Sequence, residues 1–255
     1  MPRFDAVRRK TTRHGLSLAD AAYDAVREAI LRGQLKPGAP LSRRRLATDL
    51  RMSVIPVTDA LRRLEEDGLV ESRPRAGTRV RIPSESDVRE LYELREALES
   101  QSARLFAERA TRAGRDEVRR LAREVDTLFV RLGGDESGKI AFRFVVHTTH
   151  VQFHMRVAEL AGSRLVRQMI DRKHVLILNW LFDVVGRRTP LPPHFHASLA
   201  DALASGDPVA ADAAMREHVR YGLNEISRRI GALAASEWRE RRRPQRRKRA
   251  IRKTA

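Results

Sequence analysis

The chain has 255 residues, of which 51 are Lys or Arg and 33 are Asp or Glu, so its formal net charge is +18. It has no cysteine, which excludes a disulfide framework, a thiolate metal site and a cysteine nucleophile, and favours a reducing, cytoplasmic setting. The first residues are basic without an apolar core, and no apolar run approaches the roughly 18 residues needed to cross a bilayer. We therefore expect neither secretion nor membrane insertion.

Both ends of the chain are basic. Residues 1–14 are predicted to form a basic N-terminal arm, and residues 235–255 combine many Arg and Lys residues with Pro244 and few apolar residues. This composition predicts a disordered tail. The tail would be attracted to the phosphates of nucleic acid, although a solvated tail without a partner is an equally simple interpretation.

Residues 15–82 are predicted to form a small domain of three helices and a hairpin. The predicted elements are a helix over 18–32, a helix capped by Ser42 through Leu50, a helix capped by Ser53 that ends at Gly68, and a hairpin of 69–71 with 78–82. Pro56 falls in the first turn of the third helix, where its missing N–H costs nothing. The expected core residues are Leu41, Leu46, Leu50, Val57, Leu61 and Leu64.

The second domain is predicted to be an all-helical bundle over 83–234. Ser84, with Asp87 three residues later, resembles a capping arrangement for a long helix that reaches about Ala110. Further helices are predicted over 115–132, 139–161, 163–185, 193–205 and 208–232. The predicted fold class is therefore mostly α, with a winged helix-turn-helix followed by a helical bundle.

Two short helices and a basic hairpin form a winged helix-turn-helix, in which the second helix can enter the major groove of DNA. The residues that carry a specific resemblance are Pro37-Gly38, Leu41-Ser42, Leu46-Ala47, Leu50, Ser53, Pro56-Val57, Ala60-Leu61, Leu64, Gly68-Leu69-Val70 and Arg73-Pro74-Arg75-Ala76-Gly77-Thr78-Arg79-Val80. In this order and spacing, the domain resembles the DNA-binding domain of GntR-family transcriptional regulators.

That resemblance implies which residues face DNA. In the family, two arginines of the recognition helix usually read guanines, but Val54 and Thr58 stand at these positions here. Because bidentate arginine contacts specify guanine, the family's usual operator is not expected. The predicted DNA-facing residues are Arg43, Arg44, Ser53, Thr58, Arg62, Arg75 and Gly77. For Arg62, a solvated helix face stays open as an alternative.

Histidines are concentrated in the second domain. His147, His150 and His154 are spaced by three and four residues, which places them on one face of a helix. His196 and His218 lie on the last two predicted helices. Histidines on facing helices of a bundle can hold a divalent metal, whereas a histidine on an apolar face is often an ordinary core residue.

The second domain resembles the FCD effector domain of the FadR-like branch of the same family. The resemblance rests on Glu93-Leu94-Arg95, Leu98-Glu99, His150 to His154, Ala161-Gly162, His196 to Asp207 and Met215 to His218. It implies a metal held by one Asp and three His beneath a pocket for a small carboxylate. His154, His196 and His218 match the histidines and His150 stands at the Asp position, which favours zinc or nickel over harder ions.

The same resemblance assigns two residues to the ligand pocket. Arg95 matches an arginine that faces the pocket, where it would pair with a ligand carboxylate. Ser163 replaces an Asn often found after the Ala-Gly pair. For Arg95 an ordinary helical ion pair with Glu99 stays open.

The sequence therefore predicts a ligand-responsive, sequence-specific transcriptional regulator rather than an enzyme. It would act as a homodimer on a double-stranded DNA operator, as a repressor relieved by a small organic acid. Two alternatives remain at this point, namely a metal-dependent enzyme that uses the histidines, and an architectural DNA protein held by its basic tail.

Overall fold

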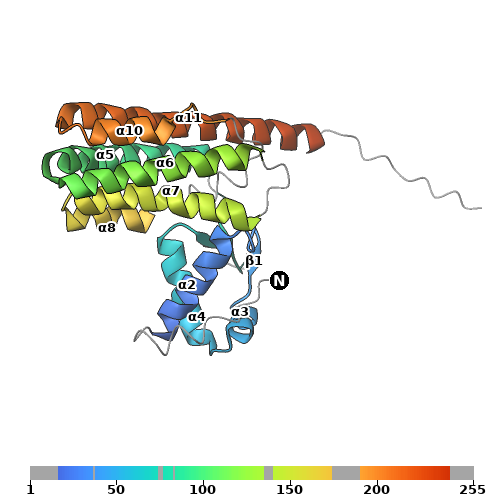
Figure 1. The fold of residues 1–255 in the computed structure, drawn as a ribbon. Helices are drawn as coiled ribbons and strands as arrows, with labels where there is room; N and C mark the ends of the chain where they lie inside the picture. The colour runs from blue at the N-terminus through green and yellow to red at the C-terminus, as the bar shows by residue number, and fades with distance from the viewer. Residues whose placement is uncertain are drawn as a thin grey trace, which may run out of the picture.

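The protein is represented by a computed structural model, which describes residues 17–36, 38–73, 77–82, 84–134, 140–173 and 190–241. These residues form a small N-terminal domain and a larger helical bundle beside it (Figure 1). The mostly α fold confirms the predicted class. The predicted N-terminal arm, the second half of the helix predicted over 163–185 and the basic end from 242 onward lie outside the described residues.

The N-terminal domain has the predicted helices and hairpin. Its elements are α2 (Leu18–Leu31), β1 (Pro40–Leu41), α3 (Arg43–Leu50), α4 (Val54–Glu66), β2 (Val70–Arg73) and β3 (Gly77–Val80). The strands form an antiparallel sheet in the order β1-β3-β2, with Glu71 opposite Arg79. All six expected core residues are buried. Strand β1 was not predicted, because two residues are too few to show an alternation.

The two serines predicted to cap α3 and α4 behave differently. The Ser42 hydroxyl accepts a hydrogen bond from the Arg45 backbone N–H at 3.3 Å, as predicted. Ser53 occupies the N-cap position of α4, but its side chain makes no capping hydrogen bond, so that prediction was wrong. The reason is local: the third residue of α4 is Pro56, which has no N–H to donate.

The bundle consists of long helices in layers (Figure 1). They are α5 (Glu85–Arg109), α6 (Arg112–Gly134), α7 (Ile140–Leu160), α8 (Arg164–Lys173), α10 (Phe195–Leu203) and α11 (Pro208–Arg241). Helix α5 packs along α11, while α6 packs against α7 and α10. Ser84 and Asp87 form the predicted capping box at the start of α5. Helix α11 continues to Arg241, past the predicted start of the tail, because its last turns contain good helix formers.

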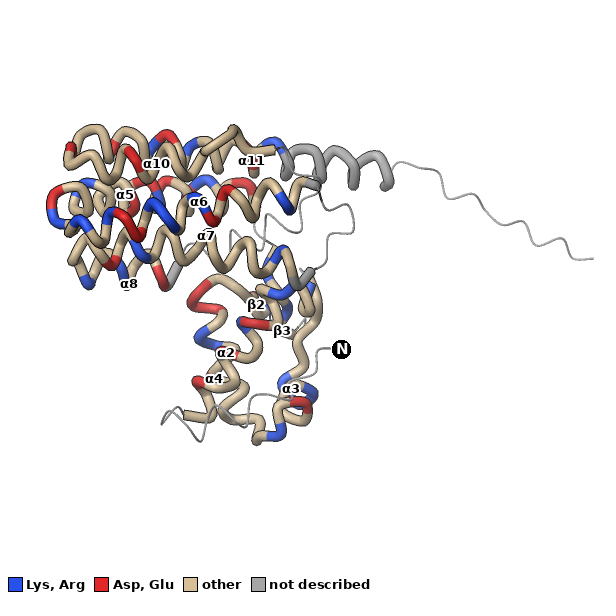
Figure 2. The backbone as a smooth tube through the Cα atoms, viewed as in Figure 1, with Lys and Arg blue, Asp and Glu red and all other residues tan. Residues whose placement is uncertain are grey.

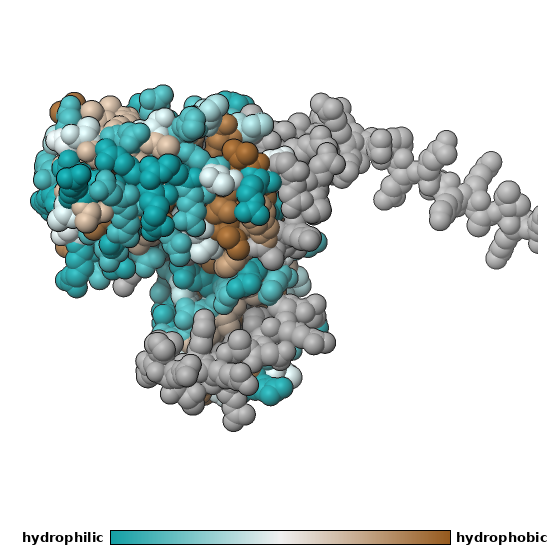
Figure 3. Space-filling model, in the orientation of Figure 1, coloured by the Kyte–Doolittle hydropathy of each residue, from teal (hydrophilic) through white to brown (hydrophobic). Residues whose placement is uncertain are grey.

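The two domains meet where α7 begins. The guanidinium of Arg32, just after α2, lies over the ring of Phe144 at 4.4 Å from its centroid. Near this end of the bundle, where α6 ends and α7 begins, Figure 3 shows a gathering of apolar surface, and Val130 and Val145 are 77% and 48% exposed. None of the described helices is long and apolar enough to cross a membrane.

Candidate functional site

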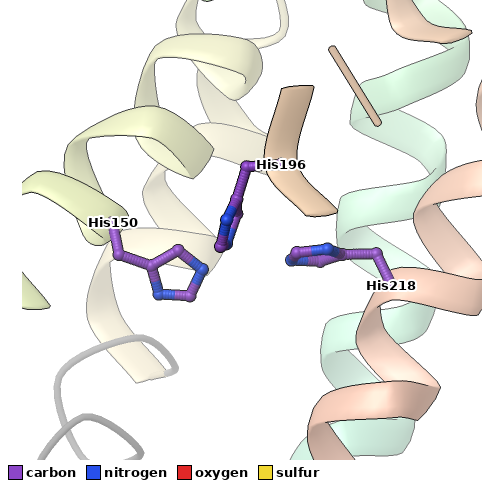
Figure 4. A group of neighbouring side chains, drawn as sticks. All are labelled: His150, His196 and His218. Atoms are coloured by element: carbon purple, nitrogen blue, oxygen red, sulfur yellow. The ribbon is translucent and has the colours of Figure 1, made fainter. Parts of the chain in front are cut away.

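Three helices bring the predicted histidines together inside the bundle. His150 and His154 lie on α7, His196 on α10 and His218 on α11. The ligand nitrogens of His150, His196 and His218 all lie within 4.8 Å of one another. In Figure 4 the three rings point toward a common centre from separate helices.

His154 joins this group from the same helix as His150. Its Nε2 lies 3.0 Å from the Nε2 of His150 and 3.3 Å from the Nε2 of His218. Two imidazole nitrogens bound to one metal at about 2.05 Å lie roughly 3.3 Å apart in a tetrahedral site and roughly 2.9 Å apart in an octahedral one. The observed spacings fit either geometry, although a hydrogen bond between two imidazoles has a similar length.

Two carboxylates contact the far nitrogens of two of these histidines. The Nδ1 of His154 lies 2.8 Å from Glu99 Oε2, and the Nδ1 of His196 lies 2.7 Å from Asp126 Oδ1. A carboxylate holds the imidazole proton on the nitrogen that it contacts, so the Nε2 lone pair faces the other way. In His196, whose Nδ1 makes a hydrogen bond with Asp126, the lone pair of Nε2 is therefore available to a metal ion.

The protonation of the cluster also suits metal binding. Burial lowers the pKa of His150 and of His218 well below the ordinary value of 6.5, and the neighbouring imidazoles lower both further. Burial also lowers the pKa of His196, although its hydrogen bond with Asp126 opposes this shift. Because neutral imidazole is the form that ligates metals, these rings need not lose a proton near pH 7. Such a donor set fits Zn²⁺ or Ni²⁺.

Besides the ring of His196, Asp126 also binds the backbone at the start of α10. Its carboxylate accepts hydrogen bonds from the backbone N–H groups of His196 and Ala197, each at 3.0 Å. These are the groups that an N-cap side chain would satisfy, but His194 at that position makes no such bond. Burial alone raises the pKa of Asp126, but the hydrogen bonds from His196 and Ala197 outweigh it and hold the carboxyl ionised.

Sequence reasoning missed Asp126. The available signal was its position in α6, one turn after Ala122 and next to Val125, both of which are fully buried. An aspartate on the apolar face of an amphipathic helix needs a buried partner. The partner, His196, is 70 residues away along the chain.

We expect Asp126→Asn to weaken metal binding by about 10- to 100-fold, the usual cost of losing a carboxylate that orients a metal-bound histidine. Competition against a chromophoric chelator measures this affinity. Asp201→Asn is the matched control, because Asp201 lies on α10, the helix that carries His196, but pairs with Arg119 of α6 at the surface. Equal metal affinity in both variants would contradict the role of Asp126.

The two predicted pocket residues differ in their placement. Arg95 is buried on α5 and donates to Glu99 through its Nε at 2.6 Å, so the ion pair left open by the sequence is present. Glu99 also contacts His154, which places Arg95 next to the histidine cluster. Ser163 is half-buried in the turn between α7 and α8, and its role in the pocket stays a prediction.

The predicted DNA-facing residues lie around α3, α4 and the wing. Arg44, Ser53 and Thr58 are exposed. Arg43 donates to Thr78 of the wing at 3.4 Å. Gly77, with φ of 80°, begins β3 in a conformation that favours glycine. Arg75 lies outside the described residues.

Arg62 is exposed but its charge is already paired. It contacts Asp59 at 2.9 Å and also Glu66, both on α4 itself. The hydrogen bond with Asp59 is the main cause of the raised pKa of Arg62. The next residue, Arg63, joins α4 to α2 through Asp20 and lies over Tyr23.

Similar proteins were found by sequence and by structure. Residues 18–80 match the model of bacterial regulatory proteins of the gntR family, and residues 90–221 match the FCD domain model. The chain is 30% identical over 240 residues to a Paenarthrobacter nicotinovorans protein named "Probable D-xylose utilization operon transcriptional repressor". The match covers 91% of this chain and 98% of that protein. It is 26% identical to the Bacillus subtilis regulator LutR, with 74% of this chain and 92% of LutR covered.

Solved structures show the same fold. A GntR regulator from Rhodococcus sp. RHA1 superposes with a TM-score of 0.64 at 24% identity, over 82% of this chain and 96% of that one. E. coli McbR/YncC superposes with a TM-score of 0.54 at 22% identity, over 88% of this chain and 99% of that one. The relatives are transcriptional regulators and not enzymes, which decides against the metal-dependent enzyme. The chain belongs to the GntR family of bacterial transcriptional regulators and carries an FCD domain.

Proposed function

We propose that this regulator is a homodimeric repressor whose hold on its operator is released by a small organic acid that binds beside a metal ion in the bundle. The observation that carries the proposal is the convergence of four histidines, two of them held by carboxylates. Two copies of the N-terminal domain would match the two halves of a palindromic operator. Repression is supported by the name of the Paenarthrobacter relative.

Arg95 supports a carboxylate as the effector. Two of its five N–H donors point to Glu99, at 2.6 and 3.4 Å, which leaves others for an incoming acid. One oxygen of the effector carboxylate would bind the metal, and the other would pair with the Arg95 guanidinium. His150, His154, His196 and His218 would hold the metal, which supplies a fixed positive charge for the acid.

The contact between the domains supports a route from the ligand to DNA. Helix α7 carries His150 and His154, and its first turns carry Phe144, over which Arg32 lies. A ligand that shifts α7 would therefore move a contact of the N-terminal domain. The ligand can change DNA affinity only by as much as it binds one conformation of the protein more tightly than the other. Such coupling free energies are typically about 1–3 kcal/mol.

The first experiment is selection of fragments of the organism's own genome on the purified protein, at near-physiological salt and with excess nonspecific competitor. A sequence-specific repressor enriches a short palindrome, and the genes beside it indicate which acids to test. Release of the enriched fragment by one of these acids, only when Zn²⁺ or Ni²⁺ is bound, is the expected result. Specific binding that no acid changes with either metal bound would refute the ligand response.

We expect removal of residues 242–255 to leave the preferred DNA sequence unchanged. The basic end supplies attraction to phosphates, so its loss should lower affinity for all fragments alike and flatten the dependence of affinity on salt. The measurement is fluorescence anisotropy with the selected palindrome and with a scrambled duplex. If the truncated protein no longer distinguishes the two duplexes, the chain is an architectural binder held by its tail.

A further inference from the structure

The start of helix α4 exposes large apolar side chains that the domain does not cover. Ile55 is 80% exposed and Val54 is 41% exposed, whereas the other large apolar residues of α4 are buried. Single exposed apolar residues are common on protein surfaces. Here two adjacent ones begin the helix that a winged helix-turn-helix inserts into the major groove.

The polar groups of α4 that could read a base edge are already engaged. The Thr58 hydroxyl donates to the carbonyl of Val54 at 2.9 Å. The two cations of this helix are Arg62, paired with Asp59 and Glu66, and Arg63, paired with Asp20. Within α4, no arginine is therefore left for a bidentate contact with guanine.

Positive charge surrounds this apolar turn. Arg44 and Arg45 on α3 are exposed, as is Arg51, which ends α3 in the left-handed conformation with φ of 55°. In the described part of the chain these three arginines have no ion pair, and Figure 2 shows the blue residues of α3 at the end of the domain away from the bundle. Arginines in such positions contact phosphates, which orient the domain without reading sequence.

We propose that Val54 and Ile55 read thymine, through the 5-methyl groups of T·A pairs in the major groove. The thymine methyl is the apolar group that the major groove offers, and apolar side chains specify it by contact. The surrounding arginines would bind the phosphates on either side. This inference deepens the proposed function, because it rests on sequence-specific binding and names the bases that are read.

The test replaces each thymine of the selected palindrome, one at a time, by deoxyuridine, which removes the methyl group and leaves the hydrogen-bonding edges intact. We expect at least one position in each half-site at which the Kd rises about three- to five-fold, the change associated with burial of one methyl group. Ile55→Ala and Val54→Ala should bind the thymine and deoxyuridine duplexes equally at that position. Both residues are exposed, so neither substitution should disturb folding.

Two control variants separate this contact from general effects. Val209→Ala removes an exposed apolar side chain in the other domain, 71% exposed at the start of α11, and should keep the full thymine preference. Arg44→Gln should weaken all duplexes alike and reduce the salt dependence, while the thymine preference stays. Specific binding by the wild-type protein with no sensitivity to deoxyuridine overturns the inference alone. A wild-type protein without any preferred duplex overturns both the inference and the proposed function.

Discussion

Glu99→Leu is expected to lower the free energy of unfolding by about 3–5 kcal/mol, because it leaves the Arg95 guanidinium buried without its partner. Arg95 and Glu99 have side chains only 5% and 2% exposed and meet at 2.6 Å. Glu99 Oε2 also lies 2.8 Å from the Nδ1 of His154, so the substitution removes a second polar contact of the same carboxylate. Urea denaturation of the metal-free protein, with a chelator present, measures the loss.

The double variant Arg95→Met/Glu99→Leu should recover much of this loss, since replacing both members of a buried ion pair by apolar side chains is often close to neutral. The matched control is Arg89→Met, which removes the exposed pair with Glu85 on the same helix and should cost less than about 1 kcal/mol. A similarly small cost for Glu99→Leu would show that the buried pair is not needed for folding.

The same pair predicts how stability depends on pH. Burial alone raises the pKa of Glu99, but the Arg95 charge and His154 outweigh it and hold the pKa far below the ordinary value of 4.5. A depressed carboxyl pKa stabilises the fold above pH 4.5, and this contribution is lost as the pH falls toward the pKa of the folded state. The double variant should therefore lose less stability than the wild type between pH 5 and pH 3.

His196→Ala/His218→Ala is expected to abolish the stabilisation that Zn²⁺ or Ni²⁺ gives to the wild type. A ligand present at 100 to 1,000 times its Kd stabilises the folded state by about 2.7–4.1 kcal/mol. The measurement is the change in stability on adding metal to the same apo protein, so that the cavities left by the two substitutions cancel. Metal content after dialysis provides an independent readout.

His194→Asn is the control for this experiment. His194 is exposed, lies two residues before His196 and has φ of 57°, a conformation that asparagine tolerates well. It should retain the metal and the full stabilisation. If the His196→Ala/His218→Ala protein retained as much metal as this control, the histidine cluster would not be the metal site.

Local signals in the sequence predicted most elements of the fold. Ser84 and Asp87 form a capping box within four consecutive residues, so the start of α5 depends on no distant contact. The same reasoning failed at Ser53, where Pro56 removes the N–H that the cap needs. The last helix also extends beyond its predicted end at residue 232, because its last turns contain good helix formers although their charge is typical of a tail.

Spacing and resemblance brought the four histidines into one prediction, but not the groups that orient them. The carboxylate of Asp126 reaches His196 only because α6 packs against α10. Likewise, the exposure of Ile55 follows from how α4 packs on α2 and α3, since hydrophobicity alone would have placed this residue in the core.

By itself the sequence determined the family, the order of helices and hairpin, the core of the N-terminal domain and the identity of the clustered histidines, because these depend on residue type and short-range spacing. Only the tertiary structure decided that Glu99 and Asp126 hold His154 and His196, that Arg95 is neutralised by Glu99, and that α4 begins with uncovered apolar side chains. The physical reason is that buried hydrogen bonds and solvent exposure depend on which helices pack together, and the packed residues can be far apart in sequence, as Asp126 and His196 are at 70 residues.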